Sequence, residues 1–402
     1  MQIFVINCGS SSIKYRLISM PDATLVCSGL VERIGTDESI LVHKVIKGTE
    51  EIVVKKQTGN VDHGGALAAV VDVMMDKESG VINSPDEIGV IGHRVLHGGQ
   101  VFSDTAFVDT AVKEKIKELI PLGPLHLPAN LTGIEVAEQL FPAAKQVAVF
   151  DTAFHQTIPA KAYKYAISND YYEQDGVRVY GFHGTSHKYV SMQANAYLNN
   201  PNAKIITIHL GNGCSMAAVN AGKCVDTSMG LGPLSGLIMG TRCGDIDASV
   251  IFHIMERTGM SATELQNVLN KKSGMLGLCG YSDMRDVKAA IKNGDAVAEL
   301  AYEMYAYRIK KYIGSYAAIL NGVDALVFTG GIGENDGAMR ALSVKDLDFL
   351  GITYNENPTK TSPDGINEYQ DINARVKVLV VPTNEELQIA KECYELAELA
   401  NN

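Results

Sequence analysis

Apolar and polar residues alternate in short runs through the first thirty residues, a pattern typical of β-strands. The runs are QIFVIN (2–7), SIKYRLISM (12–20) and TLVCSGLVE (24–32), and the turn segments CGSS and MPDA separate them. Helical periodicity follows at about 64–78. Two more apolar runs then predict strands. They are IGVIGHRV (88–95) and QVAVFDTAF (146–154), and the second reaches Asp151 where a strand would end.

The second half of the chain repeats this order of elements. KIITIHLGNGCSMAAV (204–219) predicts a strand, a glycine-rich turn and a strand, and GKCVDTSMG (222–230) follows it. Residues 296–320 predict a long amphipathic helix, and DALVFTGGIGEN (324–335) predicts a strand with a helix after it. The chain closes with a strand and a helix capped by Thr383 or Asn384. Strands mixed with helices in both halves predict an α/β protein.

The two halves also share a turn pattern. INCGSSSIKY (6–15) and HLGNGCSMAAV (209–219) both place Asn and Gly beside small hydroxyl or thiol residues between two strands. This weak internal duplication predicts two similarly folded lobes. A chain of 402 residues also exceeds what one hydrophobic core usually serves, so we expect two domains with a ligand-binding cleft between them.

Composition removes several classes of function. The 35 Lys and Arg against 46 Asp and Glu give a net charge of −11, which argues against nucleic acid as a main partner. The seven cysteines are scattered without a C-x-x-C pair, which argues against a disulfide framework or a zinc site. The first residues lack the features of a signal peptide, and no run approaches the about 20 apolar residues of a membrane span. We therefore expect a cytoplasmic protein without membrane contact.

The first segment with candidate chemistry is Asn7–Lys14, NCGSSSIK. Gly and Ser allow a turn backbone to approach an anion, hydroxyl groups donate to phosphate oxygens, and Lys14 adds a positive charge. An ordinary serine-rich hairpin turn explains the same residues. The phosphate-binding motif G-x-x-x-x-G-K-[ST] is absent from the sequence.

Two arginines stand in glycine-rich segments. Arg94 lies in HRVLHGG at the end of a predicted strand, and Arg242 lies in MGTRCGDID, where residues 241–247 predict a loop before a helix. Each suits bidentate recognition of a carboxylate or phosphate, and together they could clamp a transferring phosphoryl group. The alternatives are a solvated Arg94 in a surface turn and an Arg242 that pairs with Asp245 or Asp247.

Six of the ten histidines fall in turns punctuated by Gly or Pro, several of them near Asp151: His93, His97, His126, His155, His183 and His187. Single histidines are more often structural than catalytic, but this clustering favours a functional site. A zinc site is disfavoured, because the sequence has no H-E-x-x-H pair and no cysteine at ligand spacing.

The last segment is TGGIGEN (329–335) at the end of a predicted strand, with SDMR (282–285) earlier in the chain. Consecutive glycines at a strand end permit close contact with a flat ring or a phosphate. A glycine turn without a ligand remains the alternative.

Taken in order, these segments resemble the acetate kinase family, in the superfamily of acetate and sugar kinases, heat-shock chaperones and actin. The similarity extends over essentially the whole chain and is carried by VINCGSSSIK, GHRVLHGG, HLGNG, MGTRCGDID, FTGGIGEN and PTNEEL. It implies two actin-like (ribonuclease H-like) lobes, 1–150 with 385–402 and 151–384, the second carrying the nucleotide site, and a cleft between them. It also implies a homodimer, and reversible transfer of the ATP γ-phosphoryl group to acetate with Mg²⁺, or possible Mn²⁺, giving acetyl phosphate and ADP.

The resemblance implies roles for the matching positions. The catalytic residues would be Arg94, Asp151, His183, Asn212 and Arg242, the arginines holding the carboxylate and the phosphoryl group and His183 and Asn212 stabilising transition-state oxygens. Asn7 and Glu385 would join Asp151 in ordering Mg²⁺. Phosphate contacts would come from Ser10, Ser12, Lys14, His126, His209, Asn212 and Gly213. Adenosine contacts would come from Asp283, Met284, Arg285, Gly331, Ile332 and Asn335.

The acyl group of the acceptor would contact Leu96, Leu125, Phe182 and Pro233. Leu96 replaces a smaller apolar residue usual in the family, so we expect a tight pocket that prefers acetate to propionate. The sequence also departs from the family pattern at Leu127, Gly232, Ser235 and Met284, none of which is a charged catalytic group. The competing functions are a propionate kinase, a phosphatase or sugar kinase on the same lobes, and an ATP-gated binding module.

Overall fold

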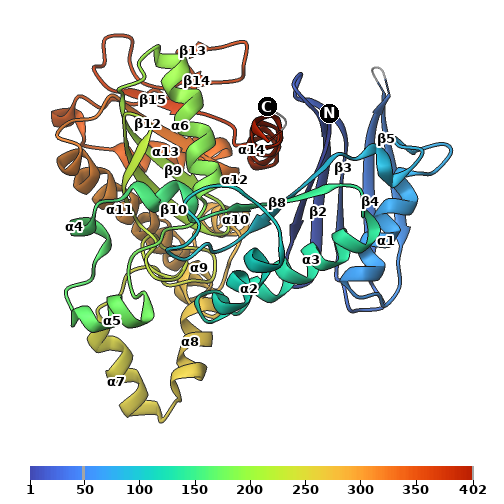
Figure 1. Cartoon of the computed structure of the whole chain (residues 1–402). Coiled ribbons are helices and arrows are strands. Elements are labelled where there is room, and N and C mark those ends of the chain that lie inside the picture. The colour runs from blue at the N-terminus through green and yellow to red at the C-terminus, as the bar shows by residue number, and fades with distance from the viewer. Residues whose placement is uncertain (48–49, 401–402) are drawn as a thin grey trace. The chain divides into compact units, whose positions relative to one another are not determined.

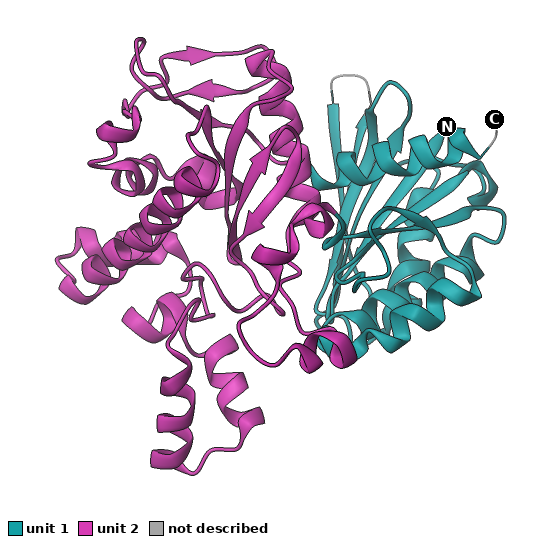
Figure 2. Ribbon diagram, turned by 60° about the vertical axis from the view of Figure 1, so that its left-hand side comes forward, with its two compact units in different colours: residues 1–153, 384–402 teal, residues 154–383 magenta. Residues whose placement is uncertain are grey.

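In the computed structural model, which describes residues 1–47 and 50–400, the chain has two compact units, each built on one β-sheet with helices against it (Figures 1 and 2). Unit 1 consists of Met1–Ala153 and Asn384–Asn402, and unit 2 of Phe154–Thr383. The α/β class expected from the alternating pattern is therefore confirmed.

The described residues of unit 1 form an eight-stranded sheet in the order β5-β4-β3-β2-β1-β6-β8-β7. Neighbours from β1 to β5 are antiparallel, whereas β6 pairs in parallel with both β1 and β8. The strands are β1 (Gln2–Cys8), β2 (Ser12–Ser19), β3 (Thr24–Glu32), β4 (Ile40–Lys47), β5 (Glu50–Gln57), β6 (Val90–Val95), β7 (Ala106–Phe107) and β8 (Lys145–Phe150).

Helices cover both faces of this sheet. They are α1 (His63–Met74), α2 (Thr110–Glu118), α3 (Leu127–Leu140) and α14 (Glu385–Leu399), with the 3-10 helices η1 (Pro85–Glu87), η2 (Ile120–Leu122) and η3 (Ala153–Thr157), the last reaching into unit 2. Helix α1 ends four residues before the expected position 78. The reason is that the Asp76 carboxylate accepts the backbone N–H groups of Glu78 and Ser79, each at 2.9 Å, and so stabilises a turn there.

Successive side chains of β1 point to opposite faces of the sheet, and this explains why unit 1 has a hydrophobic core on each face. Phe4 and Ile6 face a core shared with α1 and α3, while Ile3 and Val5 face a core shared with α14. A helix comes close to the sheet at Gly92 of β6, where an added Cβ would lie 2.7 Å from the Cys393 sulfur. The central strands β1 and β6 are therefore buried on both faces, so their polar chemistry is expected at the strand ends.

The described residues of unit 2 form a seven-stranded sheet in the order β11-β10-β9-β12-β15-β14-β13. Strand β10 is antiparallel to β9 and β11, and β12 lies in parallel between β9 and β15. The strands are β9 (Lys204–Leu210), β10 (Cys214–Asn220), β11 (Lys223–Thr227), β12 (Ala325–Thr329), β13 (Lys360–Thr361), β14 (Asn367–Glu368) and β15 (Lys377–Val380). The order β11-β10-β9-β12-β15 repeats β3-β2-β1-β6-β8, which confirms the internal duplication.

The helices of unit 2 lie on both faces of its sheet (Figure 1). Helix α6 packs on one face and α11 on the other, while α7 and α8 form a hairpin that stands away from the sheet. The helices are α4 (Ala160–Tyr163), α5 (Asn169–Asp175), α6 (Gly184–Leu198), α7 (Ala248–Thr258), α8 (Ala262–Lys271), α9 (Gly274–Cys279), α10 (Met284–Lys292), α11 (Ala296–Ile319), α12 (Gly330–Asn335) and α13 (Gly337–Val344), with the 3-10 helix η4 (Asp348–Leu350).

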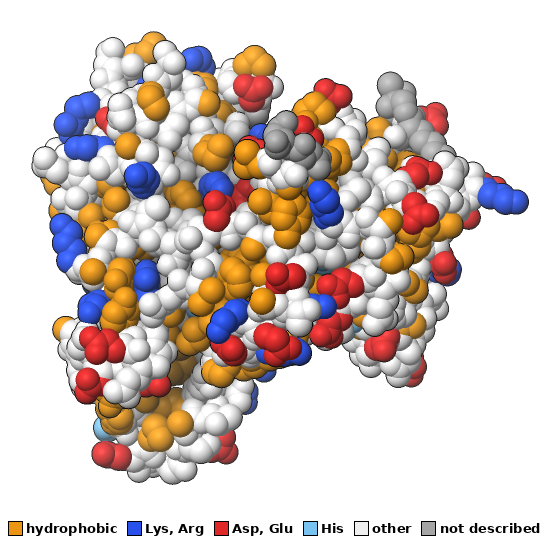
Figure 3. Space-filling model, in the orientation of Figure 1, with side chains coloured by type: hydrophobic (Ala, Val, Ile, Leu, Met, Phe, Trp, Pro, Cys, Tyr) orange, Lys and Arg blue, Asp and Glu red, His pale blue; other side chains and the backbone are white. Residues whose placement is uncertain are grey.

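Helix α12 begins at the first glycine of GGIGEN, so the helix expected after this segment includes the segment itself. Acidic and basic side chains are interspersed on the face shown in Figure 3, which therefore presents no extended surface of one charge. Among the residues described, no helix combines the length and apolar character needed to span a membrane.

Candidate active site

A pocket of about 530 Å³ lies within unit 2, a volume in the range of small-molecule sites. The six residues that the family resemblance assigns to adenosine all line it: Asp283, Met284, Arg285, Gly331, Ile332 and Asn335. The lining is completed by Gly211, Asn212, Gly240, Met275, Ser282, Lys288, Tyr305 and Asp336. Segments far apart in the sequence therefore meet around one cavity large enough for a nucleoside.

Local hydrogen bonds at the start of α10 and within α12 position the pocket residues. Asp283 caps α10 by accepting the Arg285 backbone N–H at 2.8 Å, and its carboxylate also lies 2.6 Å from Arg285 Nη2. These hydrogen bonds from Arg285 lower the pKa of Asp283 to about 2. On α12, the Asn335 amide donates to the Gly331 carbonyl at 2.9 Å. The Arg285 side chain is 90% exposed, so its ion pair is weak enough to rearrange around a ligand.

Sequence reasoning missed Lys288, Tyr305 and Asp336. Lys288 follows Met284 by four residues on α10, so helical spacing alone places both on one face. Asp336 follows GGIGEN directly, but the segment gives no sign that this side chain turns inward. Tyr305 lies in the middle of the long helix α11, where only packing distinguishes a pocket residue from a core residue.

Two glycine-rich loops of unit 2 meet beside the pocket. The Gly240 N–H donates to the Asn212 carbonyl at 3.1 Å, which joins the loop after β9 to the segment before Arg242. A Cβ placed on Gly213 would lie 3.4 Å from His183 Nε2 and 3.5 Å from Arg242 Nη1. His183, Arg242 and the loop that carries Asn212 therefore converge, although about sixty residues separate the two side chains in sequence.

Arg242 has no carboxylate partner. Its Nη1 donates to the Pro233 carbonyl at 3.0 Å, and no carboxylate among the described residues of unit 2 pairs with it. The alternative that it pairs with Asp245 or Asp247 is wrong, because Asp245 accepts from Gly236 N–H and Tyr312 OH while Asp247 caps α7. Burial lowers the pKa of Arg242, since its charge is only weakly compensated. A half-buried guanidinium of this kind is suited to an anionic ligand.

His183 occupies the left-handed region with a φ of 55° at the start of α6. Its Nδ1 lies 2.9 Å from Ser215 Oγ, and its ring stacks on His209 at a centroid distance of 4.5 Å. His209 Nδ1 in turn lies 2.8 Å from Ser186 Oγ. The contact of Nδ1 with Ser215 orients the ring and places Nε2 on the side of Gly213 and Arg242.

Other histidines of the turns are structural. His187 is fully buried between Thr207 and Ser215, and burial holds its pKa well below the usual range, so the ring is neutral. His155 is buried against the Phe182 carbonyl, and His93 pairs with Gln146 on β8. Buried histidines with protein partners are satisfied groups rather than catalysts.

In unit 1 the central feature is Arg94 at the end of β6. It makes a double hydrogen bond with Asp151, through Nε at 3.1 Å and through Nη2. The Glu385 carboxylate at the start of α14 lies 3.9 Å from the same Nε. Asp151 follows the parallel neighbour β8, so the two strand ends bring the pair together. The alternative of a solvated surface arginine is wrong, since the Arg94 side chain is only 23% exposed.

Burial and neighbouring charges shift the pKa values of Arg94 and of the carboxylates near it. Burial opposes its charge, but the carboxylates of Asp151 and Glu385 outweigh this and raise the pKa of Arg94. Burial and the nearby Asp151 raise the pKa of Glu385 despite the attraction of Arg94. Burial would raise the pKa of Glu386 as well, but the positive charges of Lys14 and Arg16 outweigh this effect and lower it. Carboxylates and cations of unit 1 are thus closely balanced at one edge of the sheet.

The β1–β2 turn lies at the same sheet edge. Gly9 N–H donates to the Ser12 carbonyl at 2.8 Å, so the segment is a hairpin turn, and Lys14 pairs with Glu386. Asn130 connects the start of this turn to the segment after β6, because its amide N–H donates to the Cys8 carbonyl and its oxygen accepts from Leu96 N–H. Asn7 and Arg94 therefore end the neighbouring strands β1 and β6, where ligands bind in open α/β sheets. Ser10 and Ser12 belong to the turn, and His126 precedes α3.

The donor set of unit 1 fits Mg²⁺. Asp151 and Glu385 offer carboxylate oxygens within 3.1 and 3.9 Å of Arg94 Nε, and Asn7 offers an amide near the end of the neighbouring strand β1. Mg²⁺ is usually held by one or two carboxylates together with waters and substrate phosphates. Among the described residues, no group of three or more His, Cys, Asp or Glu side chains is arranged to hold a metal ion by itself.

The four expected acyl-group contacts are divided between the units. Leu96 packs among apolar residues of unit 1, and a Cβ on Gly123 would lie 3.1 Å from its Cδ2. Leu125 is 58% exposed. In unit 2, Phe182 is buried and Pro233 contacts Arg242 through its carbonyl.

Gly213→Ala is expected to lower kcat by roughly tenfold or more without changing Tm. The added methyl group would stand at ordinary contact distance from His183 and Arg242, so the fold accommodates it. However, it would restrict the movement of the His183 and Arg242 side chains, which it contacts at 3.4 and 3.5 Å. Steady-state kinetics and a thermal melt test this. Gly314→Ala in α11, which meets nothing within 4 Å, is the control, and equal activities of the two variants would contradict the expectation.

Comparisons with known proteins identify the family of this chain. A family model described as the Acetokinase family matches residues 2–391. An acetate kinase of Flavobacterium johnsoniae is 52% identical over 398 residues, which cover 99% of this chain and all of that protein. An acetate kinase of Thermotoga maritima is 51% identical over 405 residues, covering 99% of both chains.

Solved structures show the same similarity. The acetate kinase of Porphyromonas gingivalis has 44% sequence identity and a TM-score of 0.91, covering 98% of this chain and 99% of that one. A propionate kinase of Francisella tularensis has 43% identity and a TM-score of 0.90 with the same coverage. Sequence and structure thus agree over nearly the full length, and the resemblance carried by the six motifs is confirmed: this chain belongs to the acetokinase family.

Proposed function

We propose that the protein is an acetate kinase that transfers the γ-phosphoryl group of ATP to acetate and gives acetyl phosphate and ADP, reversibly. The observation that carries the proposal is Arg242, a half-buried cation without a carboxylate partner, beside His183 and next to a pocket of nucleoside size. A cation in this state is expected to bind an anionic acceptor or a transferring phosphoryl group. A sugar hydroxyl as acceptor would need a general base instead.

Direct in-line transfer requires no general base. A carboxylate has a reference pKa near ~4 and is already a nucleophile at neutral pH. One acetate oxygen forms a bond to the γ-phosphorus while the bond from that phosphorus to the β–γ bridging oxygen breaks, and the electrons leave with ADP. The work of the protein is therefore positioning and charge neutralisation. We assign the acetate carboxylate and the phosphoryl oxygens to Arg94 and Arg242, with His183 and Asn212 donating to the oxygens.

Residues of unit 1 are proposed to complete the phosphate site. Asn7, Asp151 and Glu385 would hold Mg²⁺, which supplies neutralisation of phosphate charge when bound. Ser10, Ser12, Lys14 and His126 would donate to phosphate oxygens, as would His209 and Gly213 of unit 2. The ion pair of Lys14 with Glu386 would have to loosen for this, which is feasible because the Lys14 side chain is 50% exposed.

Trapping of acyl phosphate with hydroxylamine tests the reaction. The assay combines the enzyme with MgATP and acetate, propionate or butyrate. Formation of acyl hydroxamate that requires both acetate and ATP is the expected result. ATP turnover that is independent of every acid, without hydroxamate, would contradict the proposal and favour the ATP-gated binding module or a phosphatase.

A propionate kinase is the second candidate, because the Francisella tularensis propionate kinase matches this fold as well as an acetate kinase does. Leu96→Ala is expected to raise the ratio of kcat/KM for propionate to that for acetate by about tenfold, since one methylene is worth ~1–3 kcal/mol in a tight pocket. Val101→Ala, an exposed apolar residue of the same unit, is the control. A wild-type kcat/KM for propionate that equals or exceeds that for acetate would assign the second function.

We further propose a homodimer, as the family resemblance implies. Four exposed apolar side chains at helical spacing form one stripe on α11: Val297, Leu300, Met304 and Tyr307. This stripe is the candidate contact. Light scattering of the wild type and of Leu300→Glu measures the mass, and a monomeric wild type would contradict it. A cytoplasmic location remains a prediction from the sequence.

A further inference from the structure

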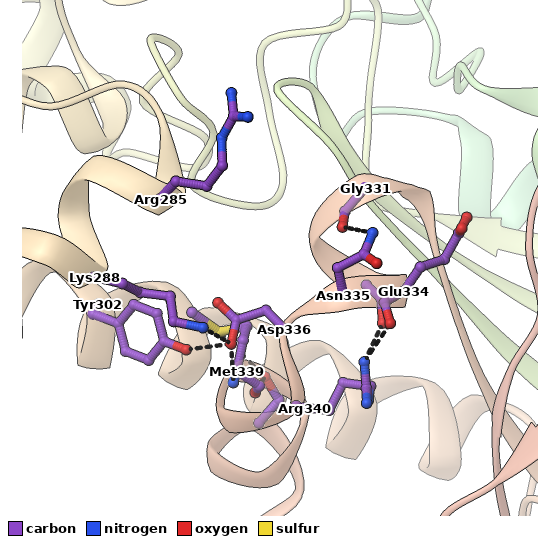
Figure 4. A network of polar contacts seen from close by, with 12 residues as sticks. Arg285, Lys288, Tyr302, Gly331, Glu334, Asn335, Asp336, Met339 and Arg340 are labelled. Carbon is purple, nitrogen blue, oxygen red and sulfur yellow. Dashed lines mark hydrogen bonds and ion pairs between the residues drawn. The ribbon is translucent and has the colours of Figure 1, made fainter. Parts of the chain in front are cut away.

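Asp336 lines the unit 2 pocket and accepts hydrogen bonds from residues of three helices (Figure 4). Its Oδ1 accepts from Lys288 Nζ of α10 at 2.9 Å and from the Tyr302 hydroxyl of α11 at 3.0 Å. The backbone N–H of Met339 on α13 donates to the same oxygen at 3.2 Å. One carboxylate oxygen thus has three donors, and it links α10, which carries Arg285, to the end of α12, which carries Asn335.

The second oxygen, Oδ2, is in the opposite situation. It is buried and has no hydrogen-bond partner among the described residues, although Asp336 as a whole is only 5% exposed. In Figure 4 the Asp336 carboxylate has one oxygen within the network and the other directed away from it, toward the side where Arg285 lies. A buried carboxylate oxygen without a donor is unfavourable, so this oxygen is prepared for a donor that the protein does not supply.

The three donors also hold the carboxylate in one orientation. Lys288, Tyr302 and Met339 come from separate elements, so Asp336 cannot rotate to satisfy Oδ2 without breaking bonds to Oδ1. Neighbouring side chains that line the pocket, Met275 and Met284, are long and unbranched and re-pack at low cost. Asp336 lines the same pocket, and its three donors keep the carboxylate in place.

We propose that Asp336 is the residue that selects the nucleobase, with Oδ2 accepting a hydrogen bond from the exocyclic amino group of adenine. This rests on the proposed function only in requiring that a nucleotide occupies the pocket. A carboxylate repels phosphate, so the group it contacts must be at the nucleoside end of the ligand.

The available acceptor favours adenine over oxopurines. Guanine offers adjacent N1–H and N2–H donors that match two free carboxylate oxygens, but here Oδ1 is already occupied. A single fixed acceptor matches one amino group. Guanine and hypoxanthine carry a carbonyl oxygen at C6 in place of that group, and this oxygen would face the Asp336 oxygen without a proton between them.

The substitution Asp336→Asn tests the role of Oδ2 separately from that of Oδ1. The asparagine carbonyl can still accept from Lys288 and Tyr302, while its amide replaces Oδ2 by a donor of nearly the same size. We expect ADP to bind about tenfold more weakly and IDP more tightly than to the wild type, measured by calorimetry with Mg²⁺ present. Lys288→Met and Tyr302→Phe weaken the link between the helices and should reduce both affinities by a similar factor.

A measurement on the wild type keeps the test independent of how the variants fold. Purine riboside 5′-diphosphate, which has hydrogen in place of the amino group, should bind roughly tenfold more weakly than ADP. Asp346→Asn, which makes the same change at an exposed carboxylate 3.7 Å from Lys310, is the control and should leave every affinity unchanged.

Equal binding of purine riboside diphosphate and ADP, or an equal effect of Asp336→Asn on ADP and IDP, would overturn the proposal. These are binding measurements, so they do not depend on acetyl phosphate formation. A protein that discriminates ADP from IDP through Asp336 but phosphorylates no carboxylic acid would support this inference while contradicting the proposed function.

Discussion

Arg242→Ala is expected to lower kcat for acetyl phosphate formation by roughly two to three orders of magnitude and to leave Tm unchanged. Among the described residues of unit 2, the guanidinium has the Pro233 carbonyl and the Met239 sulfur as partners, so its removal leaves no carboxylate of that unit without a counter-charge. Its contribution is therefore expected only when an anion is bound. Hydroxamate formation with saturating MgATP and acetate measures kcat, and a thermal melt measures stability.

Two further variants make this test specific. Arg242→Lys keeps the charge but loses the planar pair of donors, so a partial recovery of kcat is expected. Arg257→Ala removes an exposed arginine at the end of α7 and should change neither quantity. A variant Arg242→Ala with wild-type kcat would remove Arg242 from the reaction and, with it, the observation on which the proposed function rests.

Arg94→Ala is expected to lower kcat by a similar factor but also to destabilise the protein by roughly 3 kcal/mol. The Asp151 side chain is fully buried and is compensated by a double hydrogen bond from Arg94, with Glu385 close to the same nitrogen. Without Arg94 the repulsion between these carboxylates is no longer offset by its charge, and Asp151 loses the two hydrogen bonds from Arg94. A Tm several degrees below the wild type is therefore expected together with the loss of activity.

The conservative variant separates the two effects of Arg94. Lysine retains the positive charge beside Asp151, so Arg94→Lys should recover most of the Tm but little of the kcat, because a single ammonium cannot form the bidentate contact. Arg33→Ala, which breaks the exposed pair with Glu38, is the matched control and should cost less than about 1 kcal/mol. Equal stability of Arg94→Ala and the wild type would contradict the assigned pairing with Asp151.

The different surroundings of the two arginines suggest a division of roles. Arg94 is oriented by carboxylates at the ends of β6 and β8, so it can both bind an anion and balance the acidic groups proposed for Mg²⁺. Arg242 is oriented by the Pro233 carbonyl and the Met239 sulfur, and no carboxylate among the described residues of unit 2 pairs with it. The charge of Arg94 is therefore compensated by carboxylates of unit 1, whereas no carboxylate among the described residues of unit 2 compensates the charge of Arg242.

Local patterns were sufficient for many elements of the fold. The runs 2–7, 12–20 and 24–32 are β1 to β3, the pattern at 296–320 is α11, and Asn384 caps α14 as expected. Asp151 follows β8 directly, as the apolar run before it predicted. These features are readable because side-chain periodicity, turn residues and caps depend on neighbours within a few positions.

Other elements carry weaker signals. Strand β5, EEIVVKKQ, is largely exposed, and its charged ends hide the alternation that a half-buried strand would show. Helix α12 begins at two glycines, residues that normally argue against a helix, and the Gly330 N–H donates to the Glu334 carboxylate at 3.0 Å, which supports this start. Strand β5 is stabilised by its pairing with β4 and the start of α12 by this hydrogen bond, and in both places the contact outweighs the local preference.

The sequence by itself determined the α/β class, the duplicated strand–turn–strand units and, through six ordered motifs, membership of the acetokinase family. Only the tertiary structure decided which charges are paired: Arg94 pairs with Asp151, whereas among the described residues of unit 2 Arg242 has no carboxylate partner and one oxygen of Asp336 has no donor. The physical reason is that periodicity and capping are local, whereas pairing and burial depend on residues brought together from distant strands and helices. A sequence motif can identify a charged residue of the site, but the fold determines which other charged residues lie close to it.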